Sequence, residues 1–148
     1  MKKLLALTLS LGLCLVVVTS AQARSKQIGI TINLRACIDI GSGVCLTPAP
    51  ELNDVQICLR SPGEDLRCRL TEDGEYWWDY QPHGPYWAYL GEVPAGYEFV
   101  GATCTTYPGE PYQPCQVHGT RVHFVLNKEL PAFGDAVYIS FLFSPIDD

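Results

Sequence analysis

The sequence is poor in basic residues and lacks the short motifs that mark common catalytic and metal sites. Ten Lys and Arg stand against sixteen Asp and Glu, a formal net charge of −6. Because phosphate neutralisation requires clustered cations, we expect no nucleic-acid partner. No G-x-S-x-G, H-E-x-x-H, C-x-x-C or phosphate-binding loop occurs. These absences indicate a binding or structural protein rather than an enzyme.

The long apolar run of the chain lies at its start and is too short to cross a bilayer. Residues 4–18 follow two lysines and precede Ala21-Gln22-Ala23, the small-x-small pattern of a secretory cleavage site. A membrane span needs about 20 apolar residues, so we expect residues 1–23 to be a cleaved signal peptide. Residues 24–148 should then form one secreted domain without a membrane span, large enough to bury a core. Removal of Lys2 and Lys3 leaves eight basic residues against sixteen acidic ones, a net charge of −8.

Six of the seven cysteines follow the expected cleavage site. An even number behind a signal peptide is typical of three disulfides formed in an oxidising compartment. Many pairings are possible, but the spacing favours nearest neighbours, each closing a short loop. No spacing suits zinc, so we expect no metal and no other cofactor, and paired cysteines leave no thiol nucleophile. The favoured pairs are Cys37 with Cys45, Cys58 with Cys68, and Cys104 with Cys115.

Short runs of β-branched and aromatic residues alternate with polar ones, between clusters of Gly, Pro, Asp and Asn. This pattern is typical of an all-β sandwich, and no helical period is evident. The segment from 105 to 114 carries three prolines, too many for a strand, so it is expected to be a rigid loop. The eight expected strands are residues 27–35, 55–60, 66–70, 74–80, 85–93, 97–104, 120–127 and 136–143.

Four motifs follow one another from residue 55 onward: VQICLR, TEDGEYWW, HGPYWAYL and VPAGYEF. Their order resembles that of collagen-adhesin (Cna) B-type, SdrD B-like and SpaA-like domains of bacterial surface proteins, where an apolar strand leads to T-x-D-G-x-Y-x-F, G-x-Y and P-x-G-Y. The resemblance implies a prealbumin-like (transthyretin-type, Ig-like) β-sandwich of about seven to eight strands and a role in adhesion or structural support. The matching positions are Thr71, Asp73, Gly74, Tyr76, Trp78, Gly84, Tyr86 or Trp87, Pro94, Gly96 and Tyr97.

Many domains of that kind carry an isopeptide bond between a Lys and an Asn of the first and last strands. Here Ser144 stands where the asparagine would be expected. Lys26 precedes the first strand, and the strand itself offers Arg35. We therefore expect no isopeptide bond and a sandwich held by its disulfides instead.

All three tryptophans lie among the aromatic residues between positions 75 and 90. Alternation along two neighbouring strands would direct Trp78 and Tyr86 into the core and leave other rings on one exposed side. Exposed rings could stack on sugars or anchor a partner protein. Alternatively, loops cover them, or a register shifted by one residue places them in the core. The rings expected outside, as candidate binding residues, are Trp77, Trp87 and Tyr89.

The three histidines do not suggest a catalytic site. His118 and His123 are five residues apart and would point to opposite faces of one strand, and His83 lies in a Pro-Gly turn. The sequence predicts a non-enzymatic extracellular or cell-surface module of structural or adhesion type, with an unidentified protein or glycan ligand. The alternatives are a carbohydrate-binding module that uses the exposed rings and, with less support, a small secreted hydrolase, for example a transthyretin-like one.

Overall fold

The computed structural model describes residues 30–41, 43, 45, 48–106, 111–113, 115–127 and 136–146. They form nine β-strands, and no stretch of them is a helix that could cross a membrane. The expected signal peptide, residues 1–23, and Lys26 lie outside the described residues. The strands are β1 Ile30–Ile38, β2 Gln56–Arg60, β3 Arg67–Leu70, β4 Glu75–Gln81, β5 Gly84–Leu90, β6 Tyr97–Thr106, β7 Cys115–His118, β8 Arg121–Leu126 and β9 Ala136–Pro145.

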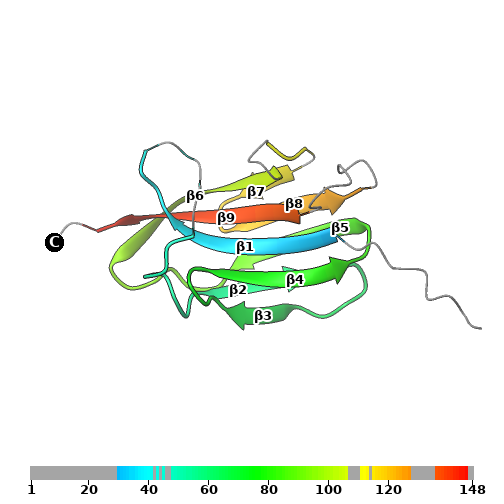
Figure 1. Cartoon of the computed structure of the whole chain (residues 1–148), viewed down its shortest axis with the longest axis horizontal. Helices are drawn as coiled ribbons and strands as arrows, with labels where there is room; N and C mark the ends of the chain where they lie inside the picture. The colour runs from blue at the N-terminus through cyan, green and yellow to red at the C-terminus, as the bar shows by residue number, and fades with distance from the viewer. Residues whose placement is uncertain are drawn as a thin grey trace, which may run out of the picture.

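The strands form two sheets that face each other (Figure 1). One has the order β4-β1-β9-β6 and the other β3-β2-β5-β8-β7. Neighbouring strands are antiparallel except β1 and β9, which run parallel from Thr31↔Ala136 to Ile38↔Phe143. The all-β architecture agrees with the sequence prediction, and each expected strand has a counterpart. The short strand β7 was not expected, because it follows the Pro-rich segment directly.

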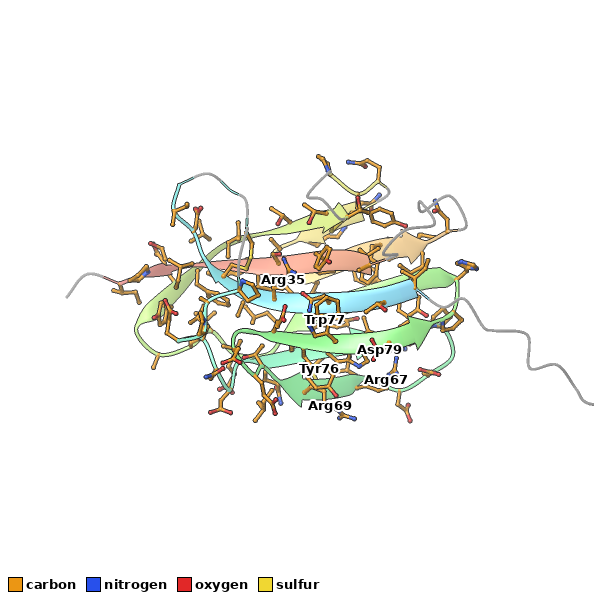
Figure 2. The ribbon with its side chains drawn as sticks, in the orientation of Figure 1. Arg35, Arg67, Arg69, Tyr76, Trp77 and Asp79 are labelled. Carbon is orange, nitrogen blue, oxygen red and sulfur yellow. A yellow bond between two sulfur atoms is a disulfide. The ribbon has the colours of Figure 1, made fainter. Side chains whose placement is uncertain are left out.

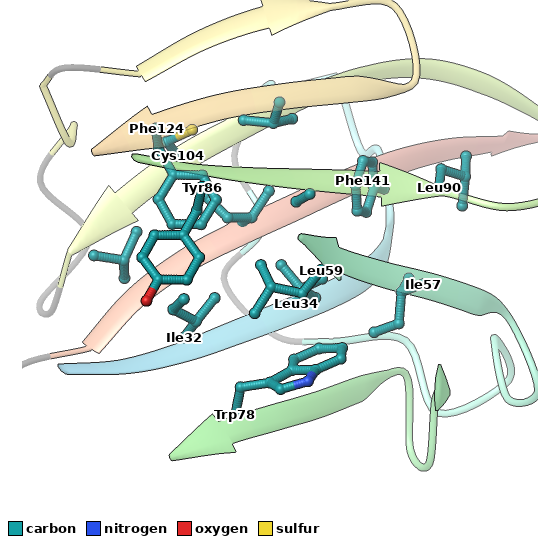
Figure 3. Close-up of a cluster of buried hydrophobic side chains, with 14 of the residues drawn as sticks. Ile32, Leu34, Ile57, Leu59, Trp78, Tyr86, Leu90, Cys104, Phe124 and Phe141 are labelled. Atoms are coloured by element: carbon teal, nitrogen blue, oxygen red, sulfur yellow. The ribbon is translucent and has the colours of Figure 1, made fainter. Parts of the chain in front are cut away.

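Strand alternation directs apolar side chains into the space between the sheets (Figure 3). Ile32 and Leu34 of β1 and Phe141 of β9 face this space from one sheet, and Leu59 and Tyr86 from the other, all without exposed surface. Burying one such side chain contributes about 1.5 to 3 kcal/mol, so the core is the main force that holds the two sheets together.

The cysteines pair as their spacing favours: Cys37 with Cys45, Cys58 with Cys68, and Cys104 with Cys115. Cys58 and Cys68 lie directly opposite each other on β2 and β3. The bridge from Cys104 on β6 to Cys115 on β7 joins an edge strand of one sheet to an edge strand of the other. The three bridges therefore constrain a loop, a strand pair and the contact between sheets, respectively.

Two glycines of the ordered motifs occupy turns with positive φ, as expected. Gly74 has φ +77°, and a Cβ there would lie 2.4 Å from the carbonyl oxygen of Ala49. Gly96 has φ +81°, in a turn closed by the Tyr97 amide, which donates to the Pro94 carbonyl at 3.1 Å. L residues with side chains rarely adopt this conformation, so both positions favour glycine.

Removing either of two disulfides should destabilise the oxidised protein by a similar amount. Cys58–Cys68 and Cys104–Cys115 span separations of 10 and 11 residues. The loop-entropy model then gives about 2.5 to 3 kcal/mol for replacing either pair by alanine. Urea unfolding followed by circular dichroism measures the loss. A loss below about 1 kcal/mol for either pair would show that residual structure in the unfolded chain already supplies that constraint.

Two buried tyrosines predict a loss of stability at alkaline pH. The Tyr86 hydroxyl donates to the Pro82 carbonyl at 2.7 Å, and the Tyr112 hydroxyl donates to the Val125 carbonyl. Burial raises the pKa of both phenols above the ordinary value of 10.0. The folded state thus holds these protons more tightly, so their stabilisation is present below about pH 10 and is lost as the pH rises through the raised pKa.

The double variant Tyr86→Phe/Tyr112→Phe should therefore show a shallower fall of unfolding free energy between about pH 9 and pH 11 than the parent protein. Urea titrations across this range measure the slope. An unchanged slope would show that groups other than these two tyrosines cause the loss of unfolding free energy at alkaline pH.

Candidate functional site

The two aromatic-rich strands do not lie side by side, so the prediction of one shared aromatic face is wrong. β4 pairs with β1 in the four-stranded sheet, whereas β5 pairs with β2 and β8 in the five-stranded sheet. The link at Pro82 and His83 crosses from one sheet to the other. Trp77 therefore lies on a different outer face from Trp87 and Tyr89.

The predicted alternation within each strand is confirmed. Trp78 is 6% exposed and packs in the core, while its neighbour Trp77 is 41% exposed. On β5, Tyr86 and Ala88 are fully buried, which directs Trp87 and Tyr89 to the outer side, where both are half-buried rather than exposed as expected. The error therefore lies in the pairing of the strands and not in the register of each strand.

Trp77 belongs to a polar and aromatic group on the outer side of the four-stranded sheet, which we call the Trp77 cluster. Figure 2 shows Trp77 and Arg35 on the same side of this sheet. The Trp77 indole donates to a Glu75 carboxylate oxygen at 3.0 Å, and its ring meets Tyr138 edge-on at 5.9 Å. The members of the Trp77 cluster are Asn33, Arg35, Glu75, Trp77 and Tyr138.

The charges of the Trp77 cluster are already paired within it. Nε of Arg35 lies 3.5 Å from Oε2 of Glu75, and the guanidinium stands 4.0 Å above the Tyr138 ring. Asn33, which is fully buried, donates to the same Glu75 oxygen at 3.0 Å and accepts from Arg35. Burial lowers the pKa of Arg35, while Glu75 opposes that shift. A partner would have to compete with these contacts, so the cluster is more suited to supporting the sheet than to binding charge.

A second group of rings lies on the outer side of the five-stranded sheet, and we call it the Trp87 face. The Trp87 ring centroid lies 4.7 Å from that of His123, 6.2 Å from that of His118 and 6.3 Å from that of Tyr89. Trp87 is thus at the centre of rings from three strands, β5, β7 and β8. Together with two arginines, the members are Arg60, Trp87, Tyr89, His118, Arg121 and His123.

Both arginines share this face because of their places in the ladders. Arg60 is directly opposite Trp87, and Arg121 is directly opposite both Tyr89 and His118. Residues opposite each other in antiparallel strands project to the same side of the sheet. Neither arginine forms an ion pair with a residue that the structure describes. The Trp87 face thus joins aromatic surface to positive charge that remains available.

The charge difference between the sheets extends over whole strands. The strands of the five-stranded sheet contain four Arg and two His, and their sequences hold no Asp or Glu. The strands of the four-stranded sheet carry three acidic residues, Glu75, Asp79 and Glu98, and one arginine, Arg35. Because the chain as a whole has sixteen acidic residues, the Trp87 face is a local positive region on an acidic protein.

The histidine prediction is wrong in one respect. His118 and His123 share a face, because the chain reverses at Gly119 and Thr120 between β7 and β8. His118 is opposite Arg121, and His123 is opposite Gln116. The signal that could have located this reversal is the dipeptide Gly119-Thr120 between two runs with β-branched residues. His83 lies in the link between β4 and β5, in a turn as expected, and is exposed.

Two hollows lie away from both aromatic groups. One, of 480 Å³, is lined by residues 53–56 and 92–95 together with Leu70. The other, of 290 Å³, lies beside β6 and β7 and is lined by residues that include Thr103, Tyr112 and Val117. Among the residues that the structure describes, no group of three or more His, Cys, Asp or Glu is placed to hold a metal ion.

Comparisons with known proteins leave the family open. No protein-family model and no curated protein matches the chain. Among solved structures, the chain is similar to the pilus adhesin RrgA from Streptococcus pneumoniae, with 19% sequence identity and a TM-score of 0.39. The match covers 81% of this chain and 15% of that one, so this chain spans a small part of the adhesin's length. A similarity at this level supports neither a family assignment nor a function.

Trp77 and Trp78 should respond differently to a collisional quencher. Since Trp77 is 41% exposed and Trp78 is 6% exposed, Trp77→Phe should remove much of the acrylamide-quenchable, red-shifted emission. Trp78→Phe, the matched control one residue away, should remove protected, blue-shifted emission instead. Fluorescence quenching of the oxidised protein checks both. Equal effects of the two substitutions would contradict the register of β4.

Proposed function

We propose that this protein is a non-enzymatic extracellular binding module, a prealbumin-like sandwich of adhesion type that holds its ligand on the Trp87 face. The observation that carries the proposal is the central position of Trp87 among the rings of Tyr89, His118 and His123. Trp, Tyr and Arg are the residues that most often dominate binding energy at interfaces, and here they stand together on one rigid sheet.

Pre-organisation supports this choice of face. The rings project from paired strands above a buried core, where Tyr86, Ala88, Val122 and Phe124 have no exposed surface. Side chains held this way lose little conformational freedom when a ligand binds. The Trp77 cluster also presents a tryptophan, but its arginine and glutamate are engaged with each other. Of the two outer faces, the Trp87 face therefore has more unused binding capacity.

The prealbumin-like type is supported by two features. The ordered motifs keep their turns at Gly74 and Gly96, and the first and last strands, β1 and β9, lie next to each other, as the isopeptide-linked strands of such domains do. Secretion is supported by the three disulfides, since such bonds persist in oxidising compartments.

A non-enzymatic role is favoured by the shape of the site. Because His118, His123 and Arg121 lie on one face, the separation of the histidines in the sequence is no longer an argument against catalysis. Catalysis, however, generally uses a concave site from which water can be excluded. The two hollows lie elsewhere, and the Trp87 face is the open side of a sheet. Such a surface is better suited to holding an extended ligand than to activating one.

Substitution of Trp87 tests the proposal on an array of extracellular glycans and matrix proteins. The oxidised mature protein should bind at least one component, and Trp87→Ala should weaken that binding about tenfold or more. Trp77→Ala, the matched control on the other sheet, should leave it within about twofold.

Two results would contradict the proposal. If both substitutions weakened ligand binding equally, or if neither weakened it, the Trp87 face would not be the binding surface. Absence of binding to any component would argue for a purely structural role.

A further inference from the structure

We propose that the ligand of the Trp87 face is an acidic oligosaccharide, a chain of sugars that carry carboxylates. This inference rests on the proposed function and adds the chemical class of the ligand. It starts from the pattern of charge on the face: each of the two outward-facing aromatic residues of β5 has an arginine directly opposite on a neighbouring strand. Arg60 of β2 accompanies Trp87, and Arg121 of β8 accompanies Tyr89.

The two other arginines of this sheet do not belong to the face. Arg67 is opposite Leu59 and Arg69 is opposite Ile57, and both of these partners are fully buried, so the ladders place both arginines on the opposite side from Trp87. Arg67 donates to Ser61 and Gln81 and is paired with Glu64. Arg60 and Arg121 are therefore the strand arginines on this side, and they have no ion pair within the described chain. An anionic group on the ligand would supply the missing counter-charge.

The ligand must also cover aromatic surface, which points to sugars. The rings of Trp87 and Tyr89 are within 29° of parallel, with centroids 6.3 Å apart, and they come from alternate positions of one strand. Successive rings of an extended chain can each lie against one of them, because the apolar C–H face of a sugar packs well on an aromatic ring. A carboxylate on the same sugar would then lie on the side of the neighbouring arginine.

An acidic peptide fits this position less well. An extended peptide gains its main-chain hydrogen bonds by pairing with the free edge of a sheet. Trp87 lies on β5, the central strand of five, with β2 on one side and β8 on the other. A nucleic acid is also disfavoured, because neutralising its phosphate backbone needs a larger cluster of cations than the two arginines of this face. A sugar chain, by contrast, can lie across the side chains of a central strand and needs no strand edge.

The test compares a charged oligosaccharide with its neutral counterpart, which has the same rings. Oligogalacturonate and its methyl ester differ in charge but keep the same backbone, and a hyaluronan oligosaccharide serves as a second carboxylated probe. Titration of the oxidised mature protein, followed by calorimetry, should give an affinity for a carboxylated probe at least about tenfold higher than for the ester. Raising the NaCl concentration should weaken binding of the acid and change binding of the ester little.

Substitutions then assign the two contributions to residues. Arg60→Gln and Arg121→Gln should each weaken binding of the acid about threefold to tenfold while leaving the ester unchanged. Arg69→Gln removes the same charge from the same sheet, but off the face, and should have no effect. Trp87→Ala should weaken both forms, whereas Trp77→Ala should weaken neither.

Each of the other possible results would overturn a specific part of the proposal. Equal affinity for acid and ester would overturn the anionic ligand and leave the binding module intact. Tighter, Trp87-dependent binding of oligoglutamate or of oligothymidylate would replace the sugar by a peptide or a nucleic acid. If neither carboxylated probe binds in a way that depends on Trp87, but the array still yields a ligand whose binding does, the inference about the acidic sugar fails and the proposed function stands. If the array also yields none, the proposed function fails with it.

Discussion

The parallel pairing of β1 with β9 is the contact on which the rest of the structure depends. These strands come from opposite ends of the described chain and form the centre of the four-stranded sheet, with β4 and β6 added at the edges. Their inward residues, among them Leu34 and Phe141, supply one side of the core. Because the pairing is long-range, its closure entropy must be offset by that buried surface. The sheet, the core and the outer faces are thus established together.

The two outer faces show how the same residue types acquire different roles. Each has a tryptophan and an arginine on neighbouring strands. In the Trp77 cluster, Glu75 stands beside Arg35, and the charge is satisfied within the protein. On the Trp87 face the neighbouring strands bring histidines and a second arginine instead of a carboxylate. The presence or absence of one acidic neighbour decides whether the surface is closed on itself or available to a ligand.

Much of the local structure could be read from the amino acids. The motif around Thr71 illustrates this: its hydroxyl donates to the Leu52 carbonyl at 2.7 Å and accepts from the Val55 amide at 3.1 Å, just before the predicted turn at Gly74. Turn residues act over a few positions, so their effect is visible in the sequence. The strand β7 was missed, since four residues between a Pro-rich segment and a Gly turn are too few to show a period.

The sequence by itself determined which rings of each strand point inward, because alternation is a local property of an extended chain. It also determined the turns and favoured the disulfide pairs, whose partners are close in sequence. Only the tertiary structure decided which strands lie together, since pairing depends on core packing between distant segments. The pairing of the strands placed Trp77 and Trp87 on different sheets. Through the reversal at Gly119, it also placed His118 and His123 beside the ring of Trp87. The candidate site therefore consists of residues whose types were evident but whose neighbours were not.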